Sequence, residues 1–151
     1  SRLAIPNGKR CDRMNSEFIV AVHAMVFLHH KADTLSSETL AENVCTNPVR
    51  IRRVLAKLKK AGLVETREGR TAGGYSYQKT RQVTLGQIAK ALNVKFANTT
   101  WHSGNKEMNC QVASGMAGYI DNLYSSLNHL CDEYLDTITI ADVERELFKK
   151  E

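Results

Sequence analysis

Hydrophobic positions recur every three or four residues in several stretches of the chain, and this spacing predicts amphipathic helices. We expect helices over residues 16–31, 36–44, 47–61 and 84–92. Between the last two, the pattern changes to short alternating segments on either side of a glycine-rich stretch, residues 69–74. That change from a helical to a strand period predicts a β-hairpin.

The helix over residues 47–61 carries the clearest local signals. Asn47 suits the N-cap, Pro48 suits the first helical position and Gly62 suits the stop. At 100° per residue, an apolar stripe of Ile51, Val54, Leu55 and Leu58 lies about 130° from a basic stripe of Arg50, Arg53, Lys57 and Lys60. The segment holds six positive charges and no negative one. One face therefore suits a core and the other a polyanion, although a basic stripe alone is more often only a solvated surface.

The elements around this helix favour DNA binding over a merely solvated face. The short helix before it, residues 36–44, and the hairpin after it reproduce the order of a helix-turn-helix followed by a wing. The hairpin tip carries arginines that can reach into a groove. The predicted fold is mostly α-helical with a small β-hairpin wing, a winged helix-turn-helix domain followed by a long helix.

That long helix is expected over residues 110–135, and it carries a continuous apolar stripe. The stripe consists of Val112, Met116, Tyr119, Ile120, Leu123, Leu127, Leu130 and Tyr134. A stripe of this length needs a large partner surface, so we expect a second copy of the chain to pair with it. Packing within the monomer stays open as the alternative. Thr139, with Asp142 three residues on, predicts the start of a last helix that ends near Phe148.

These elements suggest a division of the chain. Residues 1–13 show no periodicity and are expected to be an added segment or a disordered arm before a native start at Met14. Residues 14–95 form the DNA-binding domain, 96–109 a linker, and 110–151 the dimerisation helix and C-terminal helix. No stretch reaches the roughly 18 apolar residues of a membrane span, so a cytoplasmic protein is expected.

Charge is distributed unevenly along the 151 residues. The net charge of +5 comprises +3 in residues 1–13, +7 in residues 14–100 and −5 in residues 101–151. Positive charge thus coincides with the predicted DNA-binding domain.

Several motifs, taken in their order and spacing, resemble the Rrf2 family of bacterial winged-helix transcription regulators. They are Ser37-Glu38-Thr39-Leu40-Ala41, Asn47-Pro48-Val49 with Ile51-Arg52-Arg53-Val54-Leu55, Leu58-x-x-Ala61-Gly62-Leu63-Val64, Gly73-Gly74-Tyr75, and Val83-Thr84-Leu85-x-x-Ile88. The resemblance runs from about Met14 to Ile140. It implies a homodimer formed through the long helix and bound to a palindromic operator.

The resemblance also implies a set of DNA contacts. Asn47, Val49, Arg50, Arg52 and Arg53 would face the major groove, and Arg67, Arg70 and Gly73 of the wing would approach the minor groove or its phosphates. Arg52 and Arg53 are the best candidates for bidentate guanine contacts, whereas Lys57, Lys59 and Lys60 suit phosphates or solvent.

Cofactor chemistry is where the chain departs from the iron–sulfur members of that family. Those members carry three closely spaced cysteines before the long helix, whereas residues 98–111 hold only Cys110 and, as a further donor, His102. We therefore predict no cluster and no cofactor. A zinc site lacks suitable ligand spacing. His23, His29 and His30 are expected to be structural or solvated, since no partner ligand is spaced beside them.

Thiol chemistry remains possible for two of the four cysteines. Cys45 precedes the cap of the basic helix and Cys110 begins the long one, and backbone N–H groups at a helix start favour a thiolate. The alternative is a small inert apolar residue; the placement of Cys45 and Cys110 favours function for these two, whereas the inert role is favoured for Cys131. The family's dimer geometry implies that Cys110 of one subunit is the mate of Cys45 of the other. Cys11 lies in the N-terminal segment.

The sequence thus predicts a homodimeric DNA-binding repressor that responds to oxidants through thiol and disulfide chemistry. One alternative is the same kind of regulator controlled by a small molecule or partner protein near Trp101, with structural cysteines. A cysteine-dependent enzyme is the weaker alternative. Only His102 lies near a candidate cysteine, and no phosphate-binding glycine loop precedes a helix.

Overall fold

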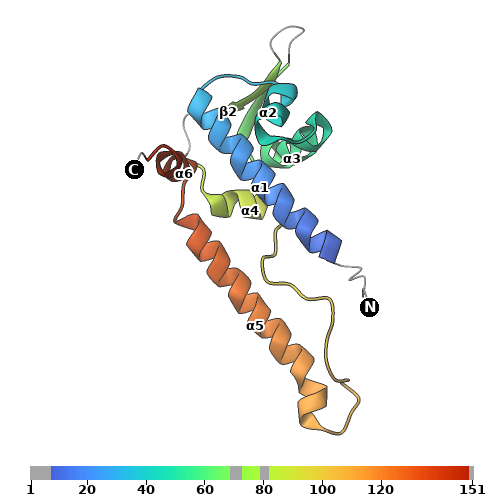
Figure 1. The fold of residues 1–151 in the computed structure, drawn as a ribbon. Helices are drawn as coiled ribbons and strands as arrows, with labels where there is room; N and C mark the ends of the chain where they lie inside the picture. The colour runs from blue at the N-terminus through green and yellow to red at the C-terminus, as the bar shows by residue number, and fades with distance from the viewer. Residues whose placement is uncertain (1–7, 69–72, 79–81, 150–151) are drawn as a thin grey trace.

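A helical domain with one β-hairpin and a projecting long helix make up the computed structural model, which describes residues 8–68, 73–78 and 82–149 (Figure 1). The elements are α1 (Gly8–Lys31), α2 (Ser37–Val44), α3 (Pro48–Lys60), β1 (Val64–Arg67), β2 (Gly74–Tyr77), α4 (Leu85–Ala91), α5 (Gln111–Asp136) and α6 (Ile140–Leu147). This mostly α-helical arrangement with a small two-stranded sheet confirms the predicted fold class.

The hydrophobic core lies where α1 packs against α2, α3 and α4. Its largest fully buried side chains include Met25, Leu28, Leu40 and Ile88. All four residues of the apolar stripe predicted for α3, from Ile51 to Leu58, are also fully buried. Burying a side chain of this size contributes about 1.5–3 kcal/mol, so this stripe fixes the rotation of α3 about its axis.

The start of α1 differs from the sequence expectation. The helix begins at Gly8 rather than Ser16, so residues 8–13 are helical instead of forming a disordered arm. After Gly8 the segment contains no proline or glycine, and most of its residues tolerate a helix well, so a helix nucleated by the core can extend backwards. Residues 1–7 lie outside the described part.

The hairpin is tied to the helical domain by backbone hydrogen bonds. β1 and β2 pair antiparallel with Val64 opposite Tyr77 and Arg67 opposite Gly74. Beyond the sheet, the N–H of Leu35 donates to the carbonyl of Tyr75 and the N–H of Tyr75 donates to the carbonyl of Leu35, both at 2.8 Å. The wing therefore has a fixed attachment to the loop that precedes α2.

α5 projects from the domain as a long rod (Figure 1). The linker before it runs away from the domain to the far end of this rod, where α5 begins. None of its 26 residues is buried. After α5 the chain returns to the domain. The N–H of Leu85 donates to the carbonyl of Ile138 and the N–H of Ile140 donates to that of Val83, both at 2.9 Å, and Ile140 is fully buried. The C-terminal end of α5 is therefore anchored, whereas its N-terminal half projects.

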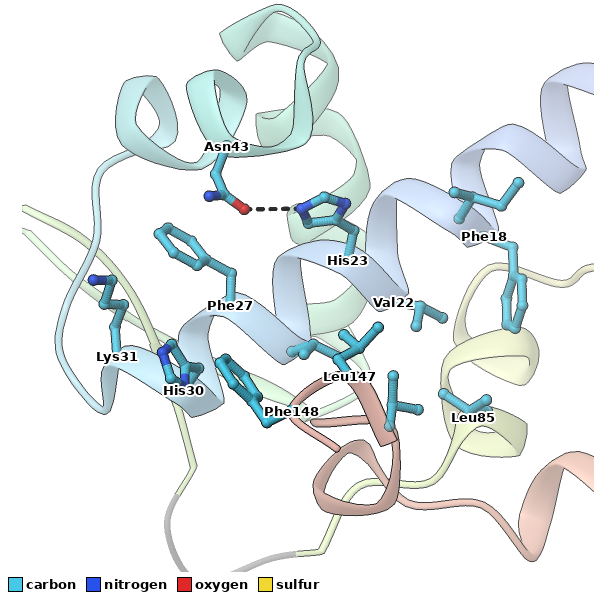
Figure 2. Close-up of a pocket in the computed structure, with 13 residues that line it drawn as sticks. Phe18, Val22, His23, Phe27, His30, Lys31, Asn43, Leu85, Leu147 and Phe148 are labelled. Atoms are coloured by element: carbon cyan, nitrogen blue, oxygen red, sulfur yellow. Dashed lines mark hydrogen bonds between the residues drawn. The ribbon is translucent and has the colours of Figure 1, made fainter. Parts of the chain in front are cut away.

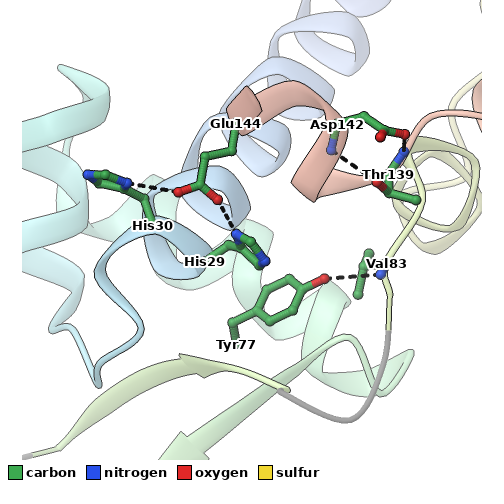
Figure 3. Close-up of polar contacts among 7 residues, drawn as sticks. All are labelled: His29, His30, Tyr77, Val83, Thr139, Asp142 and Glu144. Carbon is green, nitrogen blue, oxygen red and sulfur yellow. Dashed lines mark hydrogen bonds and ion pairs between the residues drawn. The ribbon is translucent and has the colours of Figure 1, made fainter. Parts of the chain in front are cut away.

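α6 begins at the Thr139 cap that the sequence predicts, with a complete capping box to Asp142. It is held against α1 by Glu144, whose carboxylate takes hydrogen bonds from Nδ1 of both His29 and His30 (Figure 3). Burial opposes ionisation of Glu144, but the bonds from His30 and His29 outweigh it and hold its pKa below the usual range.

Candidate nucleic-acid interface and cysteine sites

α2 and α3 form a helix-turn-helix whose turn is set by its capping residues. Ser36 caps α2 by accepting from the N–H of Thr39 at 3.1 Å, and Asn47 caps α3 by accepting from the N–H of Arg50 at 2.8 Å. Between them Cys45 adopts the left-handed conformation, with φ 64°, and ends α2. Asn47, expected to face the major groove, thus uses its side-chain oxygen as a helix cap.

The basic residues of α3 occupy the sides of the helix that are not buried. Val49 projects at the first turn with 63% of its surface exposed. Arg52 donates to the hydroxyl of Ser37 at 3.0 Å and forms an ion pair of 3.6 Å with Glu38. The guanidinium of Arg50 donates to the hydroxyl of Ser16 on α1. The arginines are thus oriented by α1 and α2 on either flank of α3.

A buried carboxylate organises two further basic residues of α3. Glu17 of α1 is only 7% exposed, and it forms ion pairs with Arg53 (3.4 Å) and Lys57 (3.1 Å). The side chains of both cations stay about half exposed. The sequence analysis gave Glu17 no role. A charged residue beside Phe18 on the core-facing helix was the one signal available for it.

Two of the three DNA-contacting residues predicted for the wing lie in the described part of the chain. Arg67 is exposed at the end of β1, and Gly73 is half-buried just before β2. Arg70 lies outside the described residues. Gly74 is required by close packing, because a Cβ there would lie 2.4 Å from the carbonyl oxygen of Leu35.

The three cysteines whose side chains are described are free thiols, and their surroundings differ. Cys110 is exposed at the N-cap of α5, where its thiol makes no capping hydrogen bond but the nearby backbone N–H groups of Ala113 and Val112 hold its pKa below the usual range. Cys45 is exposed at the carbonyl end of α2, and its thiol donates to the carbonyl of Glu42 at 3.7 Å. Cys131 is partly buried on α5.

The expectation that Cys45 lies among backbone N–H groups is therefore wrong. It precedes the cap of α3 in sequence, but the turn places it at the C-cap of α2, where its thiol donates to the carbonyl of Glu42. Cys45 and Cys110 are also not brought together in one chain, since α2 and the start of α5 lie at opposite ends of the molecule (Figure 1).

The apolar stripe of α5 is left largely uncovered in the single chain. Seven of its eight predicted residues are exposed, and Ile120 is half-buried. Trp101, in the preceding linker, is exposed as well. A surface of this size on one helix is unusual for a protein that works alone.

The capped basic helix, its supporting helix and the attached wing define a winged helix-turn-helix transcriptional regulator rather than an enzyme. The family model that matches residues 14–146 is Rrf2, described as iron-dependent transcriptional regulators. The chain belongs to this family, as the resemblance in its motifs indicated. The cysteine-dependent enzyme is accordingly excluded, because the family and the relatives are regulators.

Individual relatives agree with this assignment. The chain is 27% identical over 135 residues to the HTH-type transcriptional regulator YwnA of Bacillus subtilis, covering 89% of this chain and 99% of that protein. Among solved structures, a transcriptional regulator from Lactobacillus plantarum matches with a TM-score of 0.71 and 24% identity, covering 87% of this chain and 89% of that one. CymR, the global cysteine regulator of B. subtilis, matches with a TM-score of 0.61 and 19% identity, over 86% and 94% of the two chains.

The family is described as iron-dependent, but the side chains of this chain that could bind a metal do not form a suitable iron site. Near the start of α5 the available ligands are Cys110 and His102, and Nε2 of His102 is paired with Asp121 at 2.7 Å. No three His, Cys, Asp or Glu side chains in the described residues gather in a way that could hold a metal ion. The absence of a cofactor stays a prediction. In the same residues, no helix has the length and apolar character of a membrane span.

Proposed function

We propose that this chain is a homodimeric repressor that binds a palindromic operator and releases it when oxidants act on Cys110 and Cys45. The observation that carries the redox part is the exposed Cys110 thiol at the N-cap of α5, with its lowered pKa. A larger thiolate fraction at neutral pH makes this cysteine the reactive one. Because its operator is chromosomal, such a regulator acts in the cytoplasm.

For DNA recognition, α3 enters the major groove with Val49 and the outer ends of Arg52 and Arg53 toward the bases. Arg50 and Lys57 on its flank, together with Arg67 and Gly73 of the wing, meet the backbone or the minor groove. Asn47 fixes the first turn of α3. Arg70, in the wing tip, is proposed as a further contact on the basis of the family resemblance alone.

One arginine variant and one lysine variant test this assignment. Arg53→Ala should weaken binding to a selected operator far more than binding to random duplex, because a bidentate guanine contact is worth about 1–3 kcal/mol of discrimination. Lys60→Ala should weaken both modestly and equally. Fluorescence anisotropy on a duplex that the wild type selects from a random library measures both. Equal small losses from the two variants would contradict the role of α3.

For assembly, two copies pair through the exposed stripe of α5. The anchored C-terminal end of each helix then holds its DNA-binding domain at a fixed place relative to the partner. Half-sites one helical turn apart lie about 34 Å from each other, so the separation of the two α3 helices has to match that distance.

For the switch, with hydrogen peroxide as the oxidant, the thiolate of Cys110 attacks one peroxide oxygen and becomes a sulfenic acid as the O–O bond breaks, and the hydroxide that leaves is protonated to water. The thiol of Cys45 in the other subunit then loses its proton and attacks the sulfenic sulfur. A disulfide forms and a second water leaves. A disulfide needs the two Cα atoms within about 7 Å, so its formation moves the α3 helices to a new separation and lowers operator affinity.

An electrophoretic shift on the selected operator, with oxidant and then reductant, tests the switch. Oxidant should release DNA and give a covalent dimer on a non-reducing gel, and reductant should reverse both effects. Cys45→Ser and Cys110→Ser should each abolish the response, whereas Cys131→Ser, the matched control on α5, should keep it. A Cys45→Ser, Cys110→Ser double variant that still releases DNA on oxidation would exclude this mechanism.

A second candidate, control of the same regulator by a small apolar ligand, is favoured by one cavity. A groove of about 570 Å³ lies between α1 and α6, lined mainly by apolar side chains such as Phe18, Val22 and Leu147 (Figure 2). Its size is in the range of small-molecule sites. At its edge His23 is hydrogen bonded to Asn43 of α2 at 2.8 Å, which connects the groove to the helix-turn-helix. Trp101, the site suggested by the sequence, does not line it.

The two candidates give different results in a thiol titration. Under oxidant control, one equivalent of a thiol reagent at Cys110 blocks the response. Under ligand control, a fully alkylated protein keeps its regulated DNA binding, and an apolar fluorescent probe such as anilinonaphthalene sulfonate binds the groove and changes operator affinity.

A further inference from the structure

Glu17 occupies an unusual position beneath the proposed DNA-reading surface. Among the side chains that the structure describes, it is the one charged residue that is buried. Burying a carboxylate costs free energy unless partners compensate it, and here the partners are Arg53 and Lys57, at neighbouring positions on one side of α3. The acid thus lies next to the very cations that are proposed to meet DNA.

The atoms involved leave the DNA-binding end of the arginine available. Oε1 of Glu17 pairs with Nε of Arg53 at 3.4 Å, and Oε2 takes a hydrogen bond from Nζ of Lys57 at 3.1 Å. Since the pair is made through Nε, the inner nitrogen of the guanidinium, it does not use the two terminal amino groups, and the side chain of Arg53 stays about half exposed. Those amino groups are the fork that matches O6 and N7 of guanine.

Holding the fork in place has a thermodynamic consequence. A free arginine side chain carries about 2 kcal/mol of rotamer entropy, part of which is lost when it binds a base. In this protein the ordering occurs when α1 packs on α3 during folding. The operator complex therefore loses less entropy at Arg53 than it would with an unpaired side chain.

The carboxylate also changes non-specific binding. Affinity for any duplex comes mainly from cations that neutralise phosphates and release counterions. Glu17 neutralises part of the positive charge of Arg53 and Lys57, and its ion pair with Lys57 weakens the attraction of that lysine to a phosphate. The negative charge of Glu17 thus strengthens the recognition of bases by Arg53 and weakens non-specific binding to the DNA backbone.

From this geometry we propose that Glu17 is a positioning residue that sets the specificity of DNA recognition through Arg53 and Lys57. The proposal rests on the proposed role of α3 as the recognition helix. Glu17 itself does not touch DNA. Its effect is measured by the ratio of specific to non-specific affinity rather than by affinity alone.

The test compares Glu17→Gln with the wild type on the selected operator and on random duplex, across a range of salt concentrations. The ratio of the two affinities should fall about tenfold, the amount expected from losing one charge-assisted interaction. Non-specific binding should become tighter, and its salt dependence should steepen by up to about 0.9, because Lys57 no longer shares its charge with Glu17 when it meets a phosphate. Glu42→Gln, the same charge change at an exposed position on α2, should leave the ratio unchanged.

Further variants separate positioning from a purely structural role. Glu17→Asp keeps the charge but shortens the side chain, so it should lose operator affinity while non-specific binding stays as in the wild type. In an Arg53→Ala background, Glu17→Gln should reduce the ratio no further. Thermal unfolding of each variant shows that it is folded.

The outcomes are distinguishable from failure of the proposed function. If the wild type selects no operator, or if Arg53→Ala leaves specificity intact, α3 is not the reader. If the wild type is specific and Arg53→Ala loses specificity, while Glu17→Gln lowers both affinities in parallel or changes neither, the positioning role is overturned. The same result follows if Glu17→Gln lowers the ratio equally with and without Arg53.

Discussion

The attachment of the wing can be tested by adding a single methyl group at Gly74. Its backbone needs no glycine for conformational reasons, but a Cβ built there would lie 2.4 Å from the carbonyl oxygen and 2.7 Å from the carbonyl carbon of Leu35. Backbone atoms cannot rotate away as a side chain can. Gly74→Ala should therefore push β2 away from the loop before α2.

The cost follows from the bonds that hold this contact. Leu35 and Tyr75 exchange two backbone hydrogen bonds of 2.8 Å, each worth about 1 kcal/mol net. Losing both and shifting the strand should destabilise the fold by about 2–3 kcal/mol, a fall in Tm of roughly 4–12 °C for a domain of this size. DNA affinity should fall as well, because Arg67 is carried by the displaced hairpin.

Thermal unfolding by circular dichroism and operator binding by anisotropy measure the two effects. The matched control is Gly118→Ala on α5, where an added Cβ meets nothing within 4 Å. Gly118 lies on the side of α5 away from the apolar stripe, so this change should stabilise the helix by about 0.5–1 kcal/mol. A Gly74→Ala protein with the Tm and affinity of the wild type would refute the reasoning, since it would mean that the wing is not held by this contact.

Three further predictions concern assembly, reactivity and pH. Replacing Leu123 and Leu127 by glutamate should give monomers in light scattering, because unpaired charge in the seam costs several kcal/mol; a wild type that is monomeric at micromolar concentration would contradict the dimer. The alkylation rate of Cys110 should reach half its maximum at a pH below about 8.5, the usual pKa of a free thiol, because the lowered pKa of Cys110 enlarges its thiolate fraction. Mass spectrometry of labelled peptides measures this rate, with Cys131 as the internal comparison. Folding lowers the pKa of Glu144, so this carboxylate stabilises the fold above its unfolded pKa of about 4.3, and the stabilisation is lost as the pH falls through the folded value. Glu144→Gln should therefore make the free energy of unfolding, measured by denaturant titration, less dependent on pH below about pH 4.3. An unchanged pH dependence in that range would refute the role of this carboxylate.

Local signals in the sequence predicted the frame of the fold well. The caps Asn47 and Thr139 act on N–H groups three residues away, so their roles can be read from the sequence alone. The buried stripe of α3 follows from helical periodicity in the same way. These features need no knowledge of how distant segments meet.

The features that were missed depend on distant segments or on the backbone of a turn. Glu17 meets Lys57 forty residues later in the chain, and His29 meets Glu144 across 115 residues. Nothing in the spacing of either partner predicts such a contact. Cys45 was misplaced because its left-handed conformation, uncommon outside glycine, ends α2 one turn before α3 begins. The proposed operator, dimer and disulfide involve molecules beyond the single chain.

The one-sided anchoring of α5 has a mechanical consequence. At 1.5 Å per residue, its 26 residues form a rigid arm about 39 Å long that is fixed to the domain at its C-terminal root. A tilt of about 5° at that root displaces the far tip by roughly 3 Å, which is comparable to the rise of one base pair along B-DNA. Small changes in packing around Ile138 and Ile140 are thus geometrically amplified along the arm, so in the proposed dimer substitutions far from both α3 and Cys110 would alter the register of the two domains on the proposed half-sites.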